Sequence, residues 1–142
     1  MFIAIDFDGT CVTHDYPEVG KDIGAVPVLK RLIDAGHKLI LHTMRSGETE
    51  REAVKWFDEH EIPLYGVNSN RSQARWTKSP KVFANLYIDD TALGAPLTQD
   101  TTLSPRPFIN WREVEKILVA KGKFALRKVL IPDICNIIKL IN

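Results

Sequence analysis

Short hydrophobic runs alternate along the chain with segments in which apolar residues recur every three or four positions. The runs have the composition of buried β-strands and cover residues 2–5, 38–43, 64–67 and 86–88. Residues 22–35 and a segment beginning at Thr49 have the periodicity of amphipathic helices. Strands that alternate with helices predict a parallel sheet with helices on both faces. We therefore expect an α/β fold, a Rossmann-like three-layer α/β/α arrangement around a central, mainly parallel sheet.

Local signals mark the ends of the expected helices. Gly36 is placed to stop the first helix, and Thr49–Glu52 fits a capping box that would begin the second. Asn110 is a suitable cap for a last helix over residues 111–121. Residues 92–107 contain three prolines and predict a loop before that helix.

Length and composition are those of one compact globular domain. The chain has 142 residues, of which 44% are hydrophobic and 26% charged. Its net charge of +1 provides no field that would attract nucleic acid or an acidic membrane, so neither is expected as a partner. Cys11 and Cys135 have no metal-type or disulfide spacing. With no signal-peptide pattern and no stretch long enough to span a bilayer, we expect a cytoplasmic protein.

Acidic and hydroxyl side chains stand where three of the expected strands end. Asp6 and Asp8 follow the first strand, Thr43 ends the second, and Asp89 and Asp90 close the fourth. The carboxyl ends of parallel strands share one edge of a sheet, where such folds have their functional crevice. Neighbouring carboxylates repel each other unless a cation or a shared proton lies between them, and Mg²⁺ prefers oxygen ligands. This predicts a Mg²⁺ site; from spacing alone, the alternative is a strand followed by an acidic turn.

The same residues carry a family resemblance. A hydrophobic strand followed by Asp6-Phe7-Asp8-Gly9-Thr10 resembles the first motif of the haloacid dehalogenase (HAD) superfamily, most of whose members are phosphohydrolases. The strand that ends in Thr43 resembles the second motif, and Lys81 before the strand ending in Asp89-Asp90 resembles the last two. The resemblance covers roughly the first 95 residues, with the motifs in the order of the family.

The resemblance implies catalytic roles for four residues. The first aspartate of the family is the nucleophile that takes up the phosphoryl group, and the second is the general acid/base, which assigns these roles to Asp6 and Asp8. Thr43 would donate a hydrogen bond to the phosphoryl group, and Lys81 would steady the nucleophile and the phosphate. Lys78 is the rival for the lysine role, because the spacing of this motif varies.

The resemblance also implies Mg²⁺ as the cofactor. Its ligands would be the carboxylate of Asp6, the backbone carbonyl of Asp8, and Asp89. Asp90 would be a further ligand or a partner that supports one. The choice between Asp89 and Asp90 as the direct ligand stays open, with Asp89 preferred.

Two further residues are candidates for substrate binding. Arg45 follows the second strand, and its guanidinium suits a phosphate; a surface salt bridge is the alternative. Asn68 stands at the carboxyl end of the third strand. His14 and Asp15 could touch a substrate from the loop after the first motif, but the favoured interpretation is that they are solvated. The polar segment 71–80 contains Trp76 among basic residues and is interpreted as a solvated loop rather than a nucleotide site.

The expected protein is therefore a minimal HAD phosphatase. Too few residues separate the motifs for a cap domain, so residues 1–122 are expected to form a single catalytic domain with an open site. The role of the apolar tail, residues 123–142, stays open. The expected reaction is hydrolysis of a phosphate monoester on a small molecule or a macromolecule, and the open site leaves room for a homo-oligomer. The alternative is a receiver-like or catalytically silent phosphate-binding module on the same scaffold.

Overall fold

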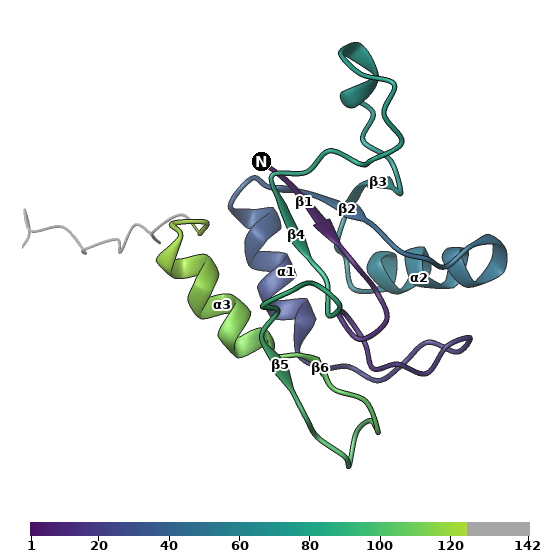
Figure 1. Cartoon of the computed structure of the whole chain (residues 1–142), viewed down its shortest axis with the longest axis vertical. Coiled ribbons are helices and arrows are strands. Elements are labelled where there is room, and N and C mark those ends of the chain that lie inside the picture. Colours follow the sequence, from purple (N-terminus) through teal and green to yellow (C-terminus); the bar gives the residue numbers. More distant parts are fainter. Residues whose placement is uncertain (125–142) are drawn as a thin grey trace, which may run out of the picture.

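Four short strands form a parallel sheet at the centre of the protein, in the order β3-β2-β1-β4 (Figure 1). The structure is a computed structural model and describes residues 1–124. The strands are β1 (Phe2–Ile5), β2 (Lys38–Leu41), β3 (Leu64–Val67) and β4 (Leu86–Ile88). Each coincides with a hydrophobic run of the sequence, and the predicted parallel pairing is confirmed.

The helices pack on one face of this sheet. They are α1 (Ala25–Asp34), α2 (Gly47–Glu59) and α3 (Trp111–Ala120). α1 and α2 connect strands that step in the same direction across the sheet, and right-handed crossovers place both helices on the same side. α3 joins them there, because Glu115 on α3 pairs with Arg31 on α1. The alternate residues Ile3 and Ile5 of β1 point into this core, together with Leu29, Leu39, Leu41, Phe57 and Trp111.

The opposite face is covered by the connection from β3 to β4. This connection steps back across the sheet, so a right-handed crossover takes it over the other side. It contains a short 3₁₀ helix, η1 (Gln73–Arg75), and part of it projects from the body (Figure 1). Val82 is buried beneath it, and the ring of Phe83 packs 6.3 Å from that of Phe2. The chain thus has a Rossmann-like three-layer α/β fold in which one layer has little regular structure.

A small antiparallel pair precedes the last helix, formed by β5 (Leu97–Thr98) and β6 (Phe108–Ile109). The backbone N–H of Ile109 donates to the carbonyl of Gly9, and the indole N–H of Trp111 donates to the carbonyl of Thr10. These bonds anchor the loop that follows β1. The segment predicted as a loop over 92–107 therefore also supports the first motif.

Two predicted helix starts need correction. The capping box at Thr49–Glu52 is wrong, because α2 already begins at Gly47 and the hydroxyl of Thr49 donates to the carbonyl of Ser46. α1 begins at Ala25 rather than at residue 22, since Gly24 precedes it in a left-handed conformation that ends the preceding turn. The predicted cap of the last helix is confirmed: the side chain of Asn110 accepts from the N–H of Glu113 at 3.3 Å.

Most of the apolar tail, residues 125–142, lies outside the described residues, so its role stays open. None of the helices in residues 1–124 has the length and apolar character needed to cross a membrane.

Candidate active site

Three carboxylates meet at the carboxyl edge of the sheet. Asp6 follows β1, and Asp89 and Asp90 follow β4; one oxygen from each of the three lies within 4.8 Å of the others. The pairing of β1 with β4 produces this arrangement, because Ile5 is in register with Ile88 and the N–H of Asp6 donates to the carbonyl of Ile88. The parallel sheet thus brings together acids that are more than 80 residues apart in the sequence.

The cluster has the charge of a cation site. Burial raises the pKa of Asp6 from 3.8 to about 7, and repulsion from Asp89 and Asp90 adds to the rise, while hydrogen bonds from the Phe7 N–H and the Thr10 side chain oppose it. A divalent cation would relieve both the repulsion and the cost of burying the charge. Oxygen-only ligands of this kind fit a hard ion such as Mg²⁺, so the residues present fit the metal that the sequence implies.

Thr10 and His14 hold this cluster, a role that the sequence assigned to neither residue. The hydroxyl of Thr10 lies 3.0 Å from a carboxylate oxygen of Asp6 and accepts from the N–H of Asp90. The Nε2 atom of His14 lies 2.8 Å from an oxygen of Asp90. His14 is half-buried, so its interpretation as a solvated loop residue is wrong. No periodicity or spacing could have placed it there, because it lies in an irregular loop.

The absence of a side chain at Gly9 leaves room for the contact between His14 and Asp90. It has a φ of +78°, and a Cβ at this position would lie 2.1 Å from Nε2 of His14 and 2.7 Å from an oxygen of Asp90. Glycine is thus required both by the left-handed backbone and by the close approach of the two side chains. The glycine of the first motif lets His14 reach the acid cluster.

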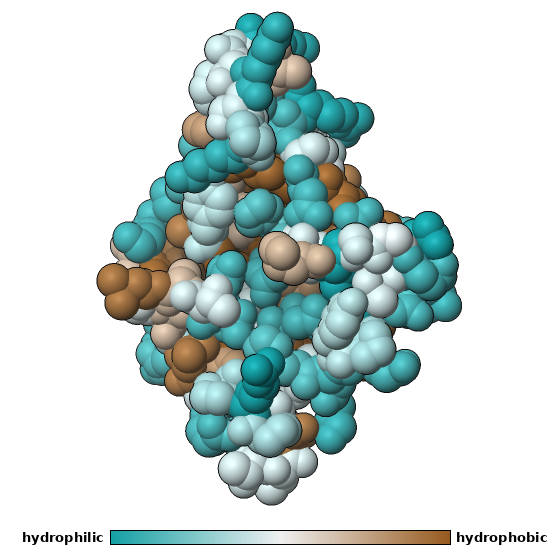
Figure 2. All heavy atoms as spheres, turned by 45° about the vertical axis from the view of Figure 1, so that its right-hand side comes forward, coloured by the Kyte–Doolittle hydropathy of each residue, from teal (hydrophilic) through white to brown (hydrophobic). Residues whose placement is uncertain are grey.

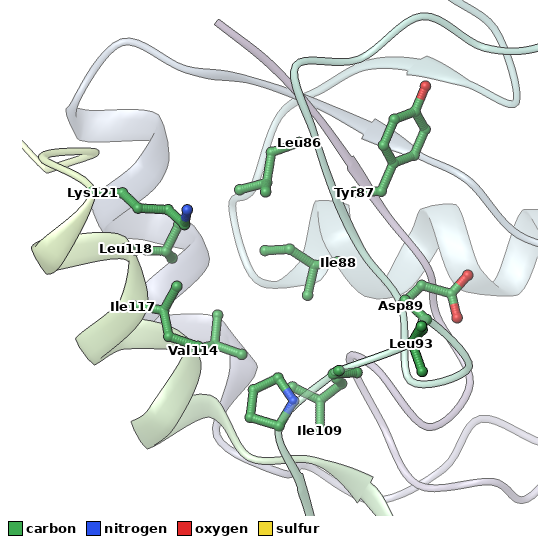
Figure 3. A pocket seen from close by; sticks show the side chains of 14 residues that line it. Leu86, Tyr87, Ile88, Asp89, Leu93, Ile109, Val114, Ile117, Leu118 and Lys121 are labelled. Atoms are coloured by element: carbon green, nitrogen blue, oxygen red, sulfur yellow. The ribbon is translucent and has the colours of Figure 1, made fainter.

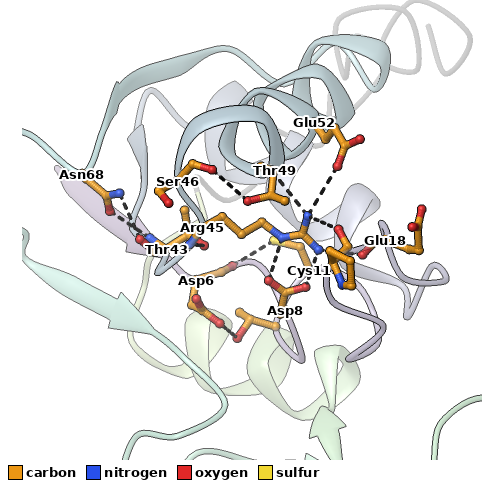
Figure 4. A network of polar contacts seen from close by, with 12 residues as sticks. Asp6, Asp8, Cys11, Glu18, Thr43, Arg45, Ser46, Thr49, Glu52 and Asn68 are labelled. Carbon is orange, nitrogen blue, oxygen red and sulfur yellow. Dashed lines mark hydrogen bonds and ion pairs between the residues drawn. The ribbon is translucent and has the colours of Figure 1, made fainter.

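Asp8 is not part of this cluster, and its side chain pairs with Arg45 (Figure 4). The Nε and Nη2 atoms of Arg45 each donate to a different oxygen of Asp8 at 2.8 Å. This bidentate ion pair joins the first motif to the loop after β2. The pair is the principal reason that the pKa of Arg45 is raised above its ordinary value, against the opposing effect of burial.

Arg45 is enclosed on every side. Its remaining N–H groups donate to the carbonyls of Pro17, Glu18 and Thr49, and its side chain is only 1% exposed. The guanidinium also lies 5.1 Å from the ring centre of Phe7. The alternative interpretation of Arg45 as a surface salt bridge is therefore wrong. All five N–H donors of the guanidinium have acceptors here, so in this arrangement Arg45 binds Asp8 and the loop 15–20 rather than an incoming phosphate.

Thr43 and Asn68 connect the ends of β2 and β3. The N–H of Thr43 donates to the side-chain oxygen of Asn68, and the Asn68 amide donates back to the carbonyl of Thr43, both at 2.9 Å. The hydroxyl of Thr43 accepts from the N–H of Arg45, a bond that does not use its own hydrogen. Asn68 therefore positions the backbone of Thr43, while its role in substrate binding stays a prediction.

The two candidate lysines lie on the segment that covers the other sheet face. Lys81 lines a groove with Trp76, Phe83 and Tyr87, and Lys78 lines a neighbouring hollow that includes Asn68. Within residues 1–124, the amine of neither lysine forms a hydrogen bond or an ion pair with a protein group. The choice between them as the catalytic lysine stays open.

A buried polar atom with no hydrogen-bond partner among residues 1–124 lies near the carboxyl edge of the sheet. His42, directly before Thr43, buries its Nδ1 atom without a hydrogen-bond partner among the described residues. Its ring lies 6.3 Å from that of Tyr87.

A solved structure described as the conserved protein coded by a locus from Bacteroides thetaiotaomicron is similar to this chain. The two sequences are 34% identical, and the match has a TM-score of 0.70 and covers 85% of this chain and 91% of the other. The chain belongs to the same family as this protein. No protein-family model matches the chain, and no curated protein matches it. The description of the family member from Bacteroides names no activity, so function must be inferred from the site itself.

Proposed function

We propose that the chain is a HAD-type phosphohydrolase, a Mg²⁺-dependent phosphatase that hydrolyses a phosphate monoester through an aspartyl-phosphate on Asp6. The observation that carries this proposal is the separation of the two aspartates of the first motif. Asp6 lies among the acids of the cation cluster, whereas Asp8 lies outside the cluster on Arg45. Two acids in different environments suit two different roles in one reaction.

Asp6 is the proposed nucleophile. One of its oxygens attacks phosphorus, the ester oxygen leaves, and water later cleaves the aspartyl-phosphate to release inorganic phosphate. Bound Mg²⁺, held by Asp6 with Asp89 or Asp90 and the backbone carbonyl of Asp8, would neutralise charge between the nucleophile and the phosphate. Thr10 fixes the orientation of the Asp6 carboxylate through the contact described above.

Asp8 is the proposed general acid/base. Both of its oxygens accept from Arg45, which orients the carboxylate, and a carboxylate can take a proton from the attacking water. To protonate the leaving oxygen in the first step, Asp8 must give up at least one of these bonds. The hydroxyl of Thr43, and Lys81 or Lys78, would hold the phosphoryl oxygens on which charge develops.

The test is turnover of p-nitrophenyl phosphate by the purified chain. We expect Mg²⁺-dependent release of p-nitrophenol that EDTA abolishes and that Asp6→Asn removes. Asp58→Asn is the matched control, because Asp58 is exposed on α2 and far from the cluster in the sequence. Turnover that resists EDTA, or Asp6→Asn at the wild-type rate, would contradict the proposal. Mg²⁺ binding without turnover would favour the silent phosphate-binding module.

A further inference from the structure

A groove of about 370 Å³ lies on the sheet face opposite the helices. Three aromatic side chains line it, and they are unusually exposed: Trp76 by 63%, Phe83 by 37% and Tyr87 by 40%. Figure 2 shows hydrophobic atoms at the surface where the projecting segment joins the body. The volume falls within the range of small-molecule sites. Exposed rings gathered in a hollow indicate a binding surface rather than core packing.

None of the three acids lines the groove, but Tyr87, which does line it, lies close to Asp89 in the sequence. Tyr87 lies on β4 and Asp89 follows this strand two residues later. Both side chains lie on the side away from α3, toward which Leu86 and Ile88 point (Figure 3). On the neighbouring strand, Ala4 is in register with Tyr87, and Asp6 follows two residues later. Two residues of strand span roughly 6–7 Å. A ligand whose phosphate is at Asp6 can therefore place the rest of its structure on Tyr87.

The chemistry of the groove favours a ring over a sugar. The side-chain amide of Gln73 is occupied by the backbone of residues 79, 81 and 83. The hydroxyl of Tyr87 donates to the carbonyl of Val82. The amine of Lys81 forms no hydrogen bond or ion pair within residues 1–124. Apart from the hydroxyls of Thr77 and Ser79, which accept from backbone N–H groups, the groove offers aromatic faces and one cation. Most hydroxyls of a sugar buried there would therefore be unpaired.

We propose that this groove, formed by Trp76, Phe83, Tyr87 and Lys81, binds the leaving group of the substrate, and that this group carries a planar aromatic ring. A nucleoside monophosphate has this chemistry, as does a phenyl phosphate. The ring stacks on the exposed aromatic side chains, and the ammonium of Lys81 faces the phosphate. The inference rests on the proposed function for the position of the phosphate, whereas binding of the ring rests on the groove alone. It revises the interpretation of Trp76 and its neighbours as a solvated loop.

The fluorescence of Trp76 can report the binding of a ligand in the groove. Of the three tryptophans, Trp56 and Trp111 are buried, at 7% and 3% exposure, so a ligand that stacks in the groove quenches mainly Trp76. The Asp6→Asn chain with Mg²⁺ would be titrated with adenosine 5′-monophosphate, phenyl phosphate and glycerol phosphate. We expect saturable quenching by the two ring-bearing compounds and none by glycerol phosphate. The first two compounds distinguish a heterocyclic base from a phenyl ring.

Substitution of Trp76 then tests specificity in the active chain. Trp76→Ala should raise KM for adenosine 5′-monophosphate by roughly 5- to 150-fold, the usual range for loss of one stacked base, and leave KM for glycerol phosphate unchanged. Trp76→Phe should restore most of the loss. Val119→Ala, which truncates an exposed apolar side chain on α3, is the control and should change neither.

The outcomes separate this inference from the proposed function. Saturable quenching by the ring-bearing compounds, in a chain without turnover, would support the groove and contradict the phosphatase. Equal changes of KM for both substrates, or the absence of quenching by either ring-bearing compound, would contradict binding of a ring in the groove. EDTA-sensitive turnover in the same chain would still support the phosphatase.

Discussion

Arg45 donates to both carboxylate oxygens of Asp8 from a side chain that is almost fully enclosed, and it ties Asp8 to the carbonyls of Pro17 and Glu18. The loop 15–20 and Asp8 are therefore held by one guanidinium. A movement of the loop 15–20 would therefore change the hydrogen bonds of Asp8, and a movement of Asp8 would change those of the loop. This makes Arg45 a positioning residue for Asp8.

Loss of Arg45 should destabilise the fold substantially. Arg45→Met leaves the carboxylate of Asp8 without its partner, and breaking a buried pair typically costs about 3 kcal/mol or more of the free energy of unfolding. Arg51→Met is the matched control, because Arg51 pairs with Glu48 on the exposed surface of α2 and its loss should cost less than about 1 kcal/mol. Urea unfolding measures both. Equal losses would show that the Arg45 pair has no special role.

Asp6 should make stability fall with rising pH when no divalent cation is present. Its pKa is about 7 in the folded chain against 3.8, so the folded state keeps a proton that the unfolded state has already released. Between about pH 4 and pH 7 the free energy of unfolding therefore decreases, and above pH 7 the decrease is complete. The shift corresponds to at most about 4 kcal/mol.

Urea unfolding in EDTA at pH 4.5 and pH 7.5 measures this dependence. The comparison of wild type with Asp6→Asn isolates the contribution of Asp6 from that of the other carboxylates. We expect Asp6→Asn to lose less stability than wild type across this range, and Mg²⁺ to restore wild type at pH 7.5. Identical pH dependence in the two chains would contradict the charge environment described for Asp6.

Gly9→Ala should cost more than its backbone conformation alone explains. Gly36 has nearly the same φ, +79° against +78°, but a Cβ on Gly36 meets nothing within 4 Å. Gly36→Ala should thus cost about 1–2 kcal/mol for a left-handed alanine. Gly9→Ala should cost more, because the new methyl group displaces His14 and Asp90, and only this variant should weaken Mg²⁺ binding. Thermal unfolding and calorimetric titration test the difference, which would vanish if the His14 contact had no role.

Asp89→Asn should weaken Mg²⁺ binding and turnover together. Removal of one charge from the three-carboxylate cluster lowers its attraction for a divalent ion, and we expect a loss of affinity of about tenfold or more. Isothermal titration calorimetry measures it, with Asp58→Asn as the control. Unchanged affinity would transfer the ligand role to Asp90 or contradict the metal site.

The sheet and its acidic edge could be predicted because they depend on patterns the sequence displays. Hydrophobic runs marked the strands, and parallel pairing then placed Asp6 next to Asp89. The surroundings of these acids could not be predicted. His14 reaches Asp90 through an irregular loop, for which no periodicity exists.

Arg45 illustrates a second limit. Three of its acceptors are backbone carbonyls, which every residue carries, so no residue type in the loop 15–20 marks it as the partner of a buried guanidinium. The aromatic groove was hidden for a similar reason. Trp76 and Tyr87 share no periodic spacing in the sequence, and the crossover from β3 to β4 brings them to the same groove.

The most direct test of the central claim is detection of the covalent intermediate. Asp8→Asn should slow proton transfer in both steps by about 10²–10⁴-fold, while Mg²⁺ binding remains because the Asp8 side chain lies outside the cluster. With 2,4-dinitrophenyl phosphate, whose leaving group needs no proton, the first step survives and the second stalls. Acid-quenched mass spectrometry of this mixture should then find a phosphate on Asp6. A phosphate on another residue, or steady turnover by Asp6→Asn at the wild-type rate, would contradict the account.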